Sequence, residues 1–294
     1  MANNSRVILV TGAGGQLGNE MQRVAEGSSD RYIFTDVAEL DITNKSAVEA
    51  FVSENEVSAI VNCAAYTNVD KAEDDAECAD LINNIAVRNL ADAAKSCDAL
   101  LVHVSTDYVF DGKGTRPYVE SDAADPIGVY GVTKLAGEKS VEESGCRYVI
   151  LRTSWLYSAW GNNFVKTMLR LTSERDELSV VADQFGTPTF AGDLADVIAS
   201  VIDQEAVRGE QVHGVYHYSN SGVCTWFDFA VAVGEMAGNS EKCAIKAIES
   251  KDFPSRVTRP SYSVLDKSKV ATTFGVVVPE WRESLLKCMK QLLR

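Results

Sequence analysis

Short apolar runs, rich in Val, Ile and Leu, alternate with longer helical stretches along the first part of the chain. Such runs predict buried strands, and the stretches between them predict helices. Strands are expected at residues 7–11, 32–36, 58–62, 100–105, 147–151 and 178–182. Helices are expected at residues 16–27, 45–54, 73–97, 129–144 and 163–174. This repeated alternation predicts an α/β fold with a doubly wound parallel sheet and helices on both of its faces.

The alternation changes near residue 183, and the pattern beyond it indicates a smaller second lobe. Helices are expected there at residues 192–207 and 225–237, with a strand near 214–218. No low-complexity stretch or obvious linker separates the two parts, so we expect one compact body. In a doubly wound sheet ligands bind at the carboxyl ends of the strands. The loops expected to supply a site are therefore 11–18, 36–43, 62–71, 105–128 and 152–163.

A glycine-rich turn follows the first predicted strand at once, with Gly12, Gly15 and Gly18. Such glycines allow a tight turn, let a pyrophosphate approach backbone amides, and let the next helix pack close to the strand. Asp36 ends the second predicted strand, where a carboxylate can bind a dinucleotide's ribose. Its alternative role is that of a turn residue. We predict a Rossmann-type dinucleotide-binding domain at residues 1–182. Residues 183–294 would form mainly a substrate-binding lobe, with some segments returning to the first domain.

Tyr130 and Lys134 lie four positions apart at the start of the helix predicted at 129–144, so their side chains leave one face. A cation about 4 Å from a phenol in a partly shielded site is worth roughly 4 kcal/mol, or about three pKa units. We therefore expect Lys134 to lower the pKa of Tyr130, so that this tyrosine can exchange a proton at neutral pH. The alternative is an ordinary surface pair.

Composition limits the class of protein. The 294 residues are 46% hydrophobic, which is enough for a large buried core. The formal charge of −14 argues against a nucleic-acid groove and against binding to an anionic membrane, although a nucleotide pocket needs only a few local cations. The first residues lead into strand one without an apolar signal segment, and no long apolar run follows, so we expect a cytoplasmic protein. The seven scattered cysteines are expected to be reduced thiols.

Further segments add to the glycine turn, and those at 62–73, 104–112 and 183–189 are much more specific than it is. The segments are Asn-Cys-Ala-Ala-Tyr-Thr-Asn-Val-Asp-Lys-Ala-Glu at 62–73, Val-Ser-Thr-Asp-Tyr-Val-Phe-Asp-Gly at 104–112, Leu-Arg-Thr-Ser-Trp-Leu-Tyr at 151–157, Gly-Asn-Asn-Phe-Val at 161–165, Asp-Gln-Phe-Gly-Thr-Pro-Thr at 183–189 and Arg-Pro at 259–260. Together with Tyr130 and Lys134, they resemble the extended short-chain dehydrogenase/reductases that act on nucleotide sugars. The resemblance covers nearly the whole chain and is most specific to the dTDP-4-dehydrorhamnose reductase branch.

The resemblance implies a nicotinamide cofactor, NADH or NADPH, along the carboxyl edge of the first domain. The cofactor-binding residues that it implies are Gly12, Gly15, Gln16 and Leu17 at the pyrophosphate, Asp36 at the ribose, Asp41 and Ile42 at the adenine, and Ala64, Ala65, Tyr66, Thr67, Tyr130 and Lys134 toward the nicotinamide. Ala64 and Ala65 could equally serve helix–sheet packing. NADH is favoured, because Asp36 and Glu39 would repel a 2′-phosphate and no Arg or Lys lies in that turn.

The resemblance also implies a reaction, hydride delivery to the C4 keto group of dTDP-4-dehydro-β-L-rhamnose to give dTDP-L-rhamnose. Thr106 would bind the sugar carbonyl, Tyr130 would donate the proton, and Lys134 would hold the nicotinamide ribose. The remaining substrate-binding candidates are Asp107, Trp155, Arg256 and Arg259, the two arginines at the pyrophosphate. Thr106 and Asp107 could instead cap a turn, Trp155 could be a core aromatic, and the arginines could be ordinary surface residues.

Two other functions within the same fold stay open, a nucleotide-sugar 4-epimerase and a non-catalytic regulatory subunit. Tyr108 follows Asp107 where the related dehydratases resemble Thr-Asp-Glu, which disfavours dehydration. Some relatives bind magnesium through glutamates at a dimer interface, and Glu20 matches one of them. Gly192, however, stands where a second acid is expected, so we predict no metal site. A homodimer is compatible with the sequence.

Overall fold

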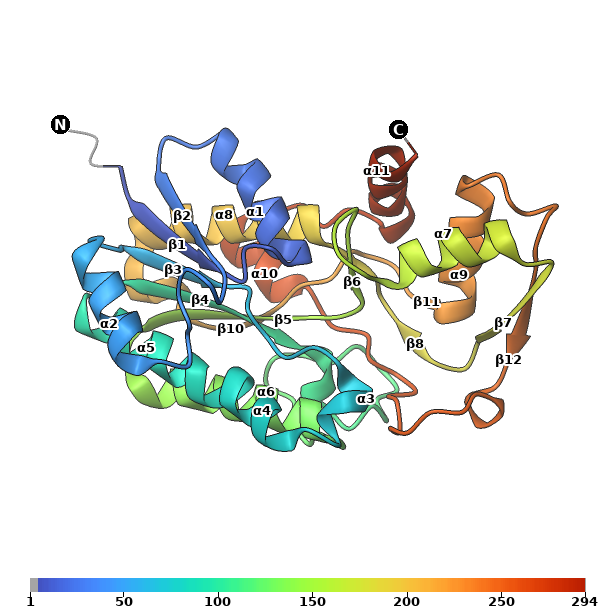
Figure 1. Ribbon diagram of the computed structural model, residues 1–294, viewed down its shortest axis with the longest axis horizontal. Coiled ribbons are helices and arrows are strands. Elements are labelled where there is room, and N and C mark those ends of the chain that lie inside the picture. Colours follow the sequence, from blue (N-terminus) through green and yellow to red (C-terminus); the bar gives the residue numbers. More distant parts are fainter. Residues whose placement is uncertain (1–4, 294) are drawn as a thin grey trace.

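A parallel six-stranded sheet forms the centre of the computed structural model, which describes residues 5–293 (Figure 1). Residues 1–4, predicted to lead into the first strand, lie outside the described residues, as does residue 294. The strands are β1 (Val7–Thr11), β2 (Arg31–Thr35), β3 (Ala59–Asn62), β4 (Leu100–Thr106), β5 (Arg147–Thr153) and β10 (Gly214–His217). Their order is β2-β1-β3-β4-β5-β10, with every pair parallel. The predicted α/β fold is confirmed.

Helices cover both faces of this sheet because neighbouring strand residues point to opposite sides. Ile8 and Val10 belong to the core under α1, α8 and α10, whereas Leu9 belongs to the core under α2, α5 and α6 (Figure 1). The bounds of these helices are α1 (Gln16–Glu26), α2 (Lys45–Glu54), α5 (Ala86–Ser96), α6 (Val129–Ser144), α8 (Ala191–Arg208) and α10 (Ser268–Phe274). Short helical segments lead into α5, namely α3 (Val69–Ala72), α4 (Ala76–Asp80) and a π-helical turn at Leu81–Ile85.

A second part of the molecule is built around α7, α9 and α11, which lie beyond the carboxyl ends of the central strands (Figure 1). Their bounds are α7 (Phe164–Glu174), α9 (Trp226–Met236) and α11 (Trp281–Leu292), and they share a core that includes Phe229, Val233 and Leu285. Its paired strands are β7 (Glu177–Val181) with β12 (Ala244–Ile248), β8 (Phe185–Gly186) with β11 (Cys224–Thr225), and β6 (Leu156–Tyr157) with β9 (Thr189–Phe190).

One predicted strand belongs to a different sheet from the one expected. The run at 178–182 was expected to continue the parallel sheet of the first domain, but β7 pairs with β12 in the second part instead. Both positions demand the same apolar pattern, so only the distant partner strand decides between them. The sixth strand of the central sheet is β10, which lies beyond residue 182 and pairs with β5.

The chain crosses between the two parts several times. Helix α7 belongs to the second part although it precedes residue 182, while α8 packs against α1 although it follows that residue. The domain boundary at residue 182 therefore stays a prediction. Within residues 5–293, no helix combines the length and the apolar character needed to cross a membrane.

Candidate active site

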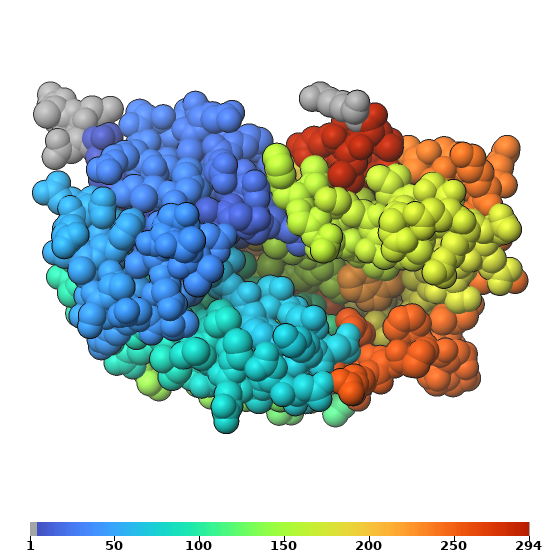
Figure 2. All heavy atoms as spheres, viewed as in Figure 1, coloured from blue at the N-terminus to red at the C-terminus, as the bar shows by residue number. Residues whose placement is uncertain are grey.

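A cavity of about 550 Å³ opens at the carboxyl ends of the central strands, where these face the second part of the molecule. Figure 2 shows the hollow between the blue N-terminal region and the yellow-green segment that contains α7. The sheet order reverses its direction at β1, and such a reversal leaves a crevice outside the strand ends. The fold therefore places the cavity where a doubly wound sheet binds its ligands.

Most of the predicted catalytic, cofactor-binding and substrate-binding residues meet in this cavity. Those that line it are Gly15, Gln16, Leu17, Ala65, Thr67, Thr106, Asp107, Tyr130, Lys134, Trp155 and Arg259. They come from the start of α1, the loop after β3, the ends of β4 and β5, the start of α6 and the segment before α10. Residues far apart in the sequence are thus gathered around one cavity.

The residues predicted to bind the ribose and the adenine lie outside the cavity lining. Asp36 directly follows β2, and its carboxylate accepts a hydrogen bond from the Gly14 N–H at 3.0 Å. Asp41 accepts hydrogen bonds from the backbone N–H and the hydroxyl of Thr43, at 2.9 and 2.7 Å. Ile42 packs into the core under α2 and α5. These contacts account for Asp41 and Ile42 as structural residues, and their adenine-binding role stays a prediction.

Gly12 and Ala64 form the base of the glycine turn. Gly12 has a left-handed φ of +66°, and a Cβ placed on it would come within 2.7 Å of the Ala64 nitrogen. The turn therefore requires glycine here on two counts, backbone conformation and space. Helix α1 begins after Gly15 with no side-chain cap, and Gly15, Gln16 and Leu17 line the cavity. The first-turn amides of an uncapped helix are a suitable site for a pyrophosphate, so this cradle fits the implied cofactor.

Tyr66 and Arg256 also lie outside the cavity lining. The Tyr66 hydroxyl donates to Asp75 at 3.2 Å. Arg256 is exposed and forms an ion pair with the exposed Asp74. By contrast, Arg259 is partly buried, lines the cavity, and pairs with Asp70 at 2.8 Å. Only one of the two predicted arginines is therefore placed to meet a ligand in this cavity.

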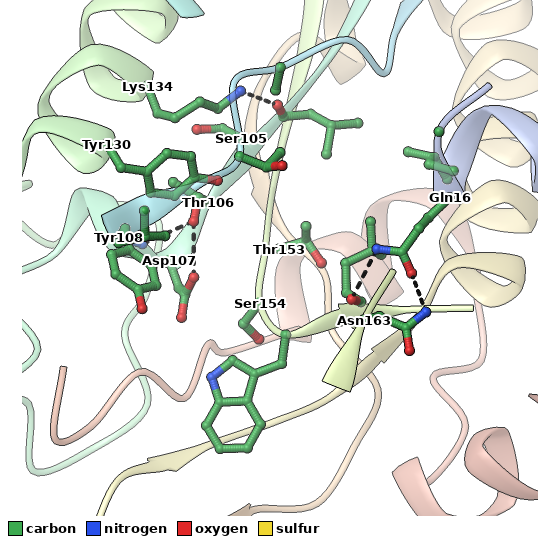
Figure 3. A pocket seen from close by; sticks show the side chains of 18 of the residues that line it. Gln16, Ser105, Thr106, Asp107, Tyr108, Tyr130, Lys134, Thr153, Ser154 and Asn163 are labelled. Carbon is green, nitrogen blue, oxygen red and sulfur yellow. Dashed lines mark hydrogen bonds between the residues drawn. The ribbon is translucent and has the colours of Figure 1, made fainter. Parts of the chain in front are cut away.

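Thr106 and Tyr130 lie next to each other on the same side of the cavity (Figure 3). Thr106 ends β4, accepts a hydrogen bond from the Tyr108 N–H at 3.2 Å, and donates to Asp107 Oδ1 at 3.0 Å. It is thus both a turn cap and a cavity residue. Tyr130 lies in the first turn of α6, and its ring and that of Tyr108 form a T-shaped pair with a centroid distance of 5.5 Å. The two hydroxyl groups can therefore approach one ligand atom.

The expected lowering of the tyrosine pKa is wrong for this structure. Burial raises the pKa of Tyr130 well above its ordinary value, and a hydrogen bond with Thr106 only partly opposes this. The Lys134 Nζ donates to the Val104 carbonyl at 2.7 Å. The spacing of four residues correctly placed both side chains on one face, but it could not show where the ammonium would point. Tyr130 is consequently protonated at neutral pH.

Burial sets the protonation of two further residues. It lowers the pKa of Lys134 to about 8, an effect that the carboxylate of Glu138 opposes. It also raises the pKa of Asp107 to about 6, against hydrogen bonds with Ser263 and Thr106 that lower it. A cationic and an acidic group in the same cavity thus both titrate within two units of neutral pH.

The comparisons with known proteins bear on the whole chain. The family model described as RmlD substrate binding domain matches residues 6–294. A dTDP-4-dehydrorhamnose reductase of Escherichia coli strain K12 is 41% identical over 293 residues, which covers 97% of each chain. The chain belongs to the dTDP-4-dehydrorhamnose reductase family of oxidoreductases. The resemblance inferred from the sequence motifs is confirmed.

Solved structures of this family superpose closely on the chain. A dTDP-4-dehydrorhamnose reductase from Clostridium acetobutylicum is 44% identical, with a TM-score of 0.93 over 98% of this chain and 100% of that one. Another, from Bacillus anthracis and in complex with NADP, is 40% identical, with a TM-score of 0.92 over 98% and 99% of the two chains. These family members span the same length as this chain, so the cavity belongs to a fold that they share.

An arginine contacts Glu20, where some relatives were expected to bind magnesium, and the lack of a metal site stays a prediction. Glu20 is buried and accepts a hydrogen bond from Arg23 at 3.2 Å, and Arg23 also donates to the Gly192 carbonyl and to Asp196. A guanidinium thus already neutralises these carboxylates, and Gly192 adds none. Within residues 5–293, no cluster of three or more potential metal ligands is present.

The sequence did not single out every residue that lines the cavity, and Trp226 and Asn163 are two that it missed. The Trp155 ring, at a residue with a left-handed φ of 48°, stacks on Trp226 at a centroid distance of 3.6 Å. The Gln16 side chain accepts a hydrogen bond from Asn163 Nδ2 at 2.9 Å and so joins α1 to the start of α7 (Figure 3). Asn163 lies in the Gly-Asn-Asn-Phe-Val segment, which could have flagged it. Nothing local marks Trp226, which reaches the cavity only through the packing of α9.

Proposed function

We propose that the protein reduces the C4 keto group of dTDP-4-dehydro-β-L-rhamnose with NADH or NADPH and forms dTDP-L-rhamnose. The observation that carries this proposal is the shared cavity, in which Tyr130 and Thr106 lie opposite the uncapped start of α1. A nicotinamide nucleotide anchored at that helix and a sugar carbonyl bound at the two hydroxyl groups would meet in this space. The names of the family members support the choice of substrate.

The residues of the chain divide the chemistry among them. The reduced nicotinamide, when bound, supplies the hydride. Tyr130 donates its phenolic proton to the oxygen at C4, and its raised pKa suits this direction, because it is protonated and the alkoxide it meets is more basic still. Thr106 orients the carbonyl through its hydroxyl group, and Lys134 binds the ribose beside the nicotinamide. The stacked Trp155 and Trp226 wall the substrate side.

Arg259 is the better of the two predicted contacts for the substrate pyrophosphate. It lines the cavity, and its guanidinium pairs with the carboxylate of Asp70. A pyrophosphate would offer it a second, bidentate anion. Arg256, which lies outside the lining, stays a prediction as a ligand.

NADH is the cofactor that we expect to be used at least as well as NADPH. Asp36 and Glu39 both follow β2, and the Glu39 carboxylate accepts from the Asp36 N–H at 2.9 Å, so two acids lie close together in the turn. Such a turn repels a 2′-phosphate. Steady-state kinetics with both cofactors tests this. A kcat/KM ten times higher for NADPH, about 1.4 kcal/mol in the opposite direction, would contradict it.

Incubation with dTDP-4-dehydro-L-rhamnose and each reduced nicotinamide tests the activity itself. We expect the absorbance of the reduced cofactor to fall in proportion to the sugar reduced, and we expect this fall to be lost with Tyr130→Phe. A cofactor recovered unchanged while the sugar is converted would identify a 4-epimerase instead. Absence of any conversion with a folded, cofactor-binding protein would favour a regulatory subunit.

A further inference from the structure

His103 is a fully buried histidine in the middle of β4 that the chemistry described above does not use. Its ring nitrogens face two side chains, with Nδ1 3.1 Å from Asn62 Nδ2 and Nε2 3.5 Å from Lys134 Nζ. The strand register places Thr11, Asn62 and His103 abreast on β1, β3 and β4. A buried row of polar side chains therefore crosses the sheet and ends at Lys134.

The backbone fixes which way round the Asn62 amide lies. The Ala64 N–H, which can only donate, lies 3.1 Å from Asn62 Oδ1, and the Thr11 hydroxyl donates to the same oxygen at 2.8 Å. Asn62 Nδ2 must therefore face His103, and because it can only donate, Nδ1 of the imidazole must accept. A neutral imidazole has a single N–H, so its hydrogen is on Nε2.

This N–H points at Lys134. Burial, together with the positive charge of Lys134, lowers the pKa of His103 well below its ordinary value, so the ring stays neutral. When Nζ is protonated it has only N–H donors, so it faces the Nε2–H of His103 with no acceptor between the two groups. When Nζ is a neutral amine, its lone pair can accept from the Nε2–H. The Val104 carbonyl accepts from Nζ in both forms and keeps it in place.

We propose that His103, held by Asn62 in its Nε2–H tautomer, is a positioning residue that favours release of the proton from Lys134. On α6, the carboxylate of Glu138 acts in the opposite direction and raises the pKa of Lys134, although it also pairs with Arg152 of β5 at 2.6 Å. Burial acts in the same direction as His103, since it lowers the pKa of Lys134 to about 8. The charge of Lys134 bears on how it binds the ribose beside the nicotinamide, a consequence that rests on the proposed function.

Nitrogen NMR of the full chain labelled with ¹⁵N-histidine tests the tautomer without any variant and without catalysis. We expect His103 to show a protonated Nε2 and an unprotonated, hydrogen-bonded Nδ1 throughout neutral pH. A protonated Nδ1 would overturn the proposal, because Nε2 would then accept from the ammonium and stabilise it.

Titration of Lys134, followed by NMR of ¹³C-labelled lysine in the substrate-free protein, tests the effect on the proton. His103→Gln can turn an amide oxygen toward Nζ, so we expect the midpoint to rise by about one pH unit, a tenfold tighter hold on the proton. Thr11→Val is the matched control, since it removes one bond to Asn62 but leaves the Ala64 N–H to orient the amide, and its midpoint should stay at the wild-type value. An unchanged midpoint in a folded His103→Gln protein, or an equal shift in both variants, would refute the proposal.

In His103→Gln, the alkaline limb of the pH profile of kcat/KM should move to higher pH together with the titration midpoint of Lys134. A limb that moves while overall activity is retained also excludes a merely structural role. If the midpoint shifts but no reduction is observed even with the wild type, the proposed function fails and the assignment of His103 stands.

Discussion

Tyr130 is the residue on which the chemistry depends most. Tyr130→Phe removes only the phenolic oxygen, so fold and cofactor affinity should be kept. The maximal rate should fall by roughly 10²-fold or more, the usual scale for loss of a general acid. Steady-state kinetics together with cofactor titration measures both properties. Near-normal turnover in this variant would show that another group donates the proton.

Asp107 provides a pH-dependent prediction about stability. Its pKa is raised from 3.8 to about 6 by burial, so the folded protein binds this proton more tightly than the unfolded chain. The tighter binding of this proton contributes to the free energy of unfolding, fully below about pH 4. This stabilisation is lost as the pH rises through about 6, a change on the order of 3 kcal/mol. Asp107→Asn cannot titrate.

Urea unfolding of both proteins across this pH window measures the difference. The free energy of unfolding of the wild type, relative to that of Asp107→Asn, should fall as the pH rises and then level off above the raised pKa. Parallel pH curves for the two proteins would show that Asp107 is not in the buried environment that the structure gives it.

At the scale of the element, the turn between β1 and α1 should tolerate no side chain at Gly12. Gly12→Ala adds a Cβ within 2.7 Å of the Ala64 backbone at a φ of +66°. Cofactor affinity should fall at least tenfold, since the turn must shift. Gly275→Ala is the matched control, because it has the same φ of +66° but nothing within 4 Å of the added Cβ. Both variants should lose about 1 kcal/mol of stability from the strained backbone.

Cofactor titration and thermal unfolding of the two variants separate strain from collision. Equal cofactor affinities for Gly12→Ala and Gly275→Ala would mean that the close approach to Ala64 is unimportant for binding.

The elements that could be predicted from the sequence are those determined by local pattern. The apolar run before Gly12 and the spacing of Tyr130 and Lys134 are readable within a few residues, and the structure places them as expected on β1 and α6. The orientation of the Lys134 ammonium depends on the carbonyl of Val104, which belongs to another element. Likewise, β7 joins β12 rather than the central sheet because a partner far along the chain is available. Tertiary contacts of this kind leave no local mark.

Over the whole molecule, a formal charge of −14 coexists with a cavity whose lining includes the cationic Lys134 and Arg259. The charge that matters for a nucleotide sugar is therefore local, as the sequence suggested. The hydrogen bond between Gln16 and Asn163 also ties the cofactor turn to the second part, so the cavity is formed by both. A homodimer and a cytoplasmic location stay predictions.

Transfer of an isotope tests the central claim most directly. With NADH deuterated at the transferred position of the nicotinamide, the account predicts one deuterium at C4 of dTDP-L-rhamnose for each cofactor oxidised. Mass spectrometry and proton NMR of the purified sugar nucleotide measure both its presence and its position. Product that lacks deuterium at C4, or conversion without net oxidation of the cofactor, would contradict reduction by this protein.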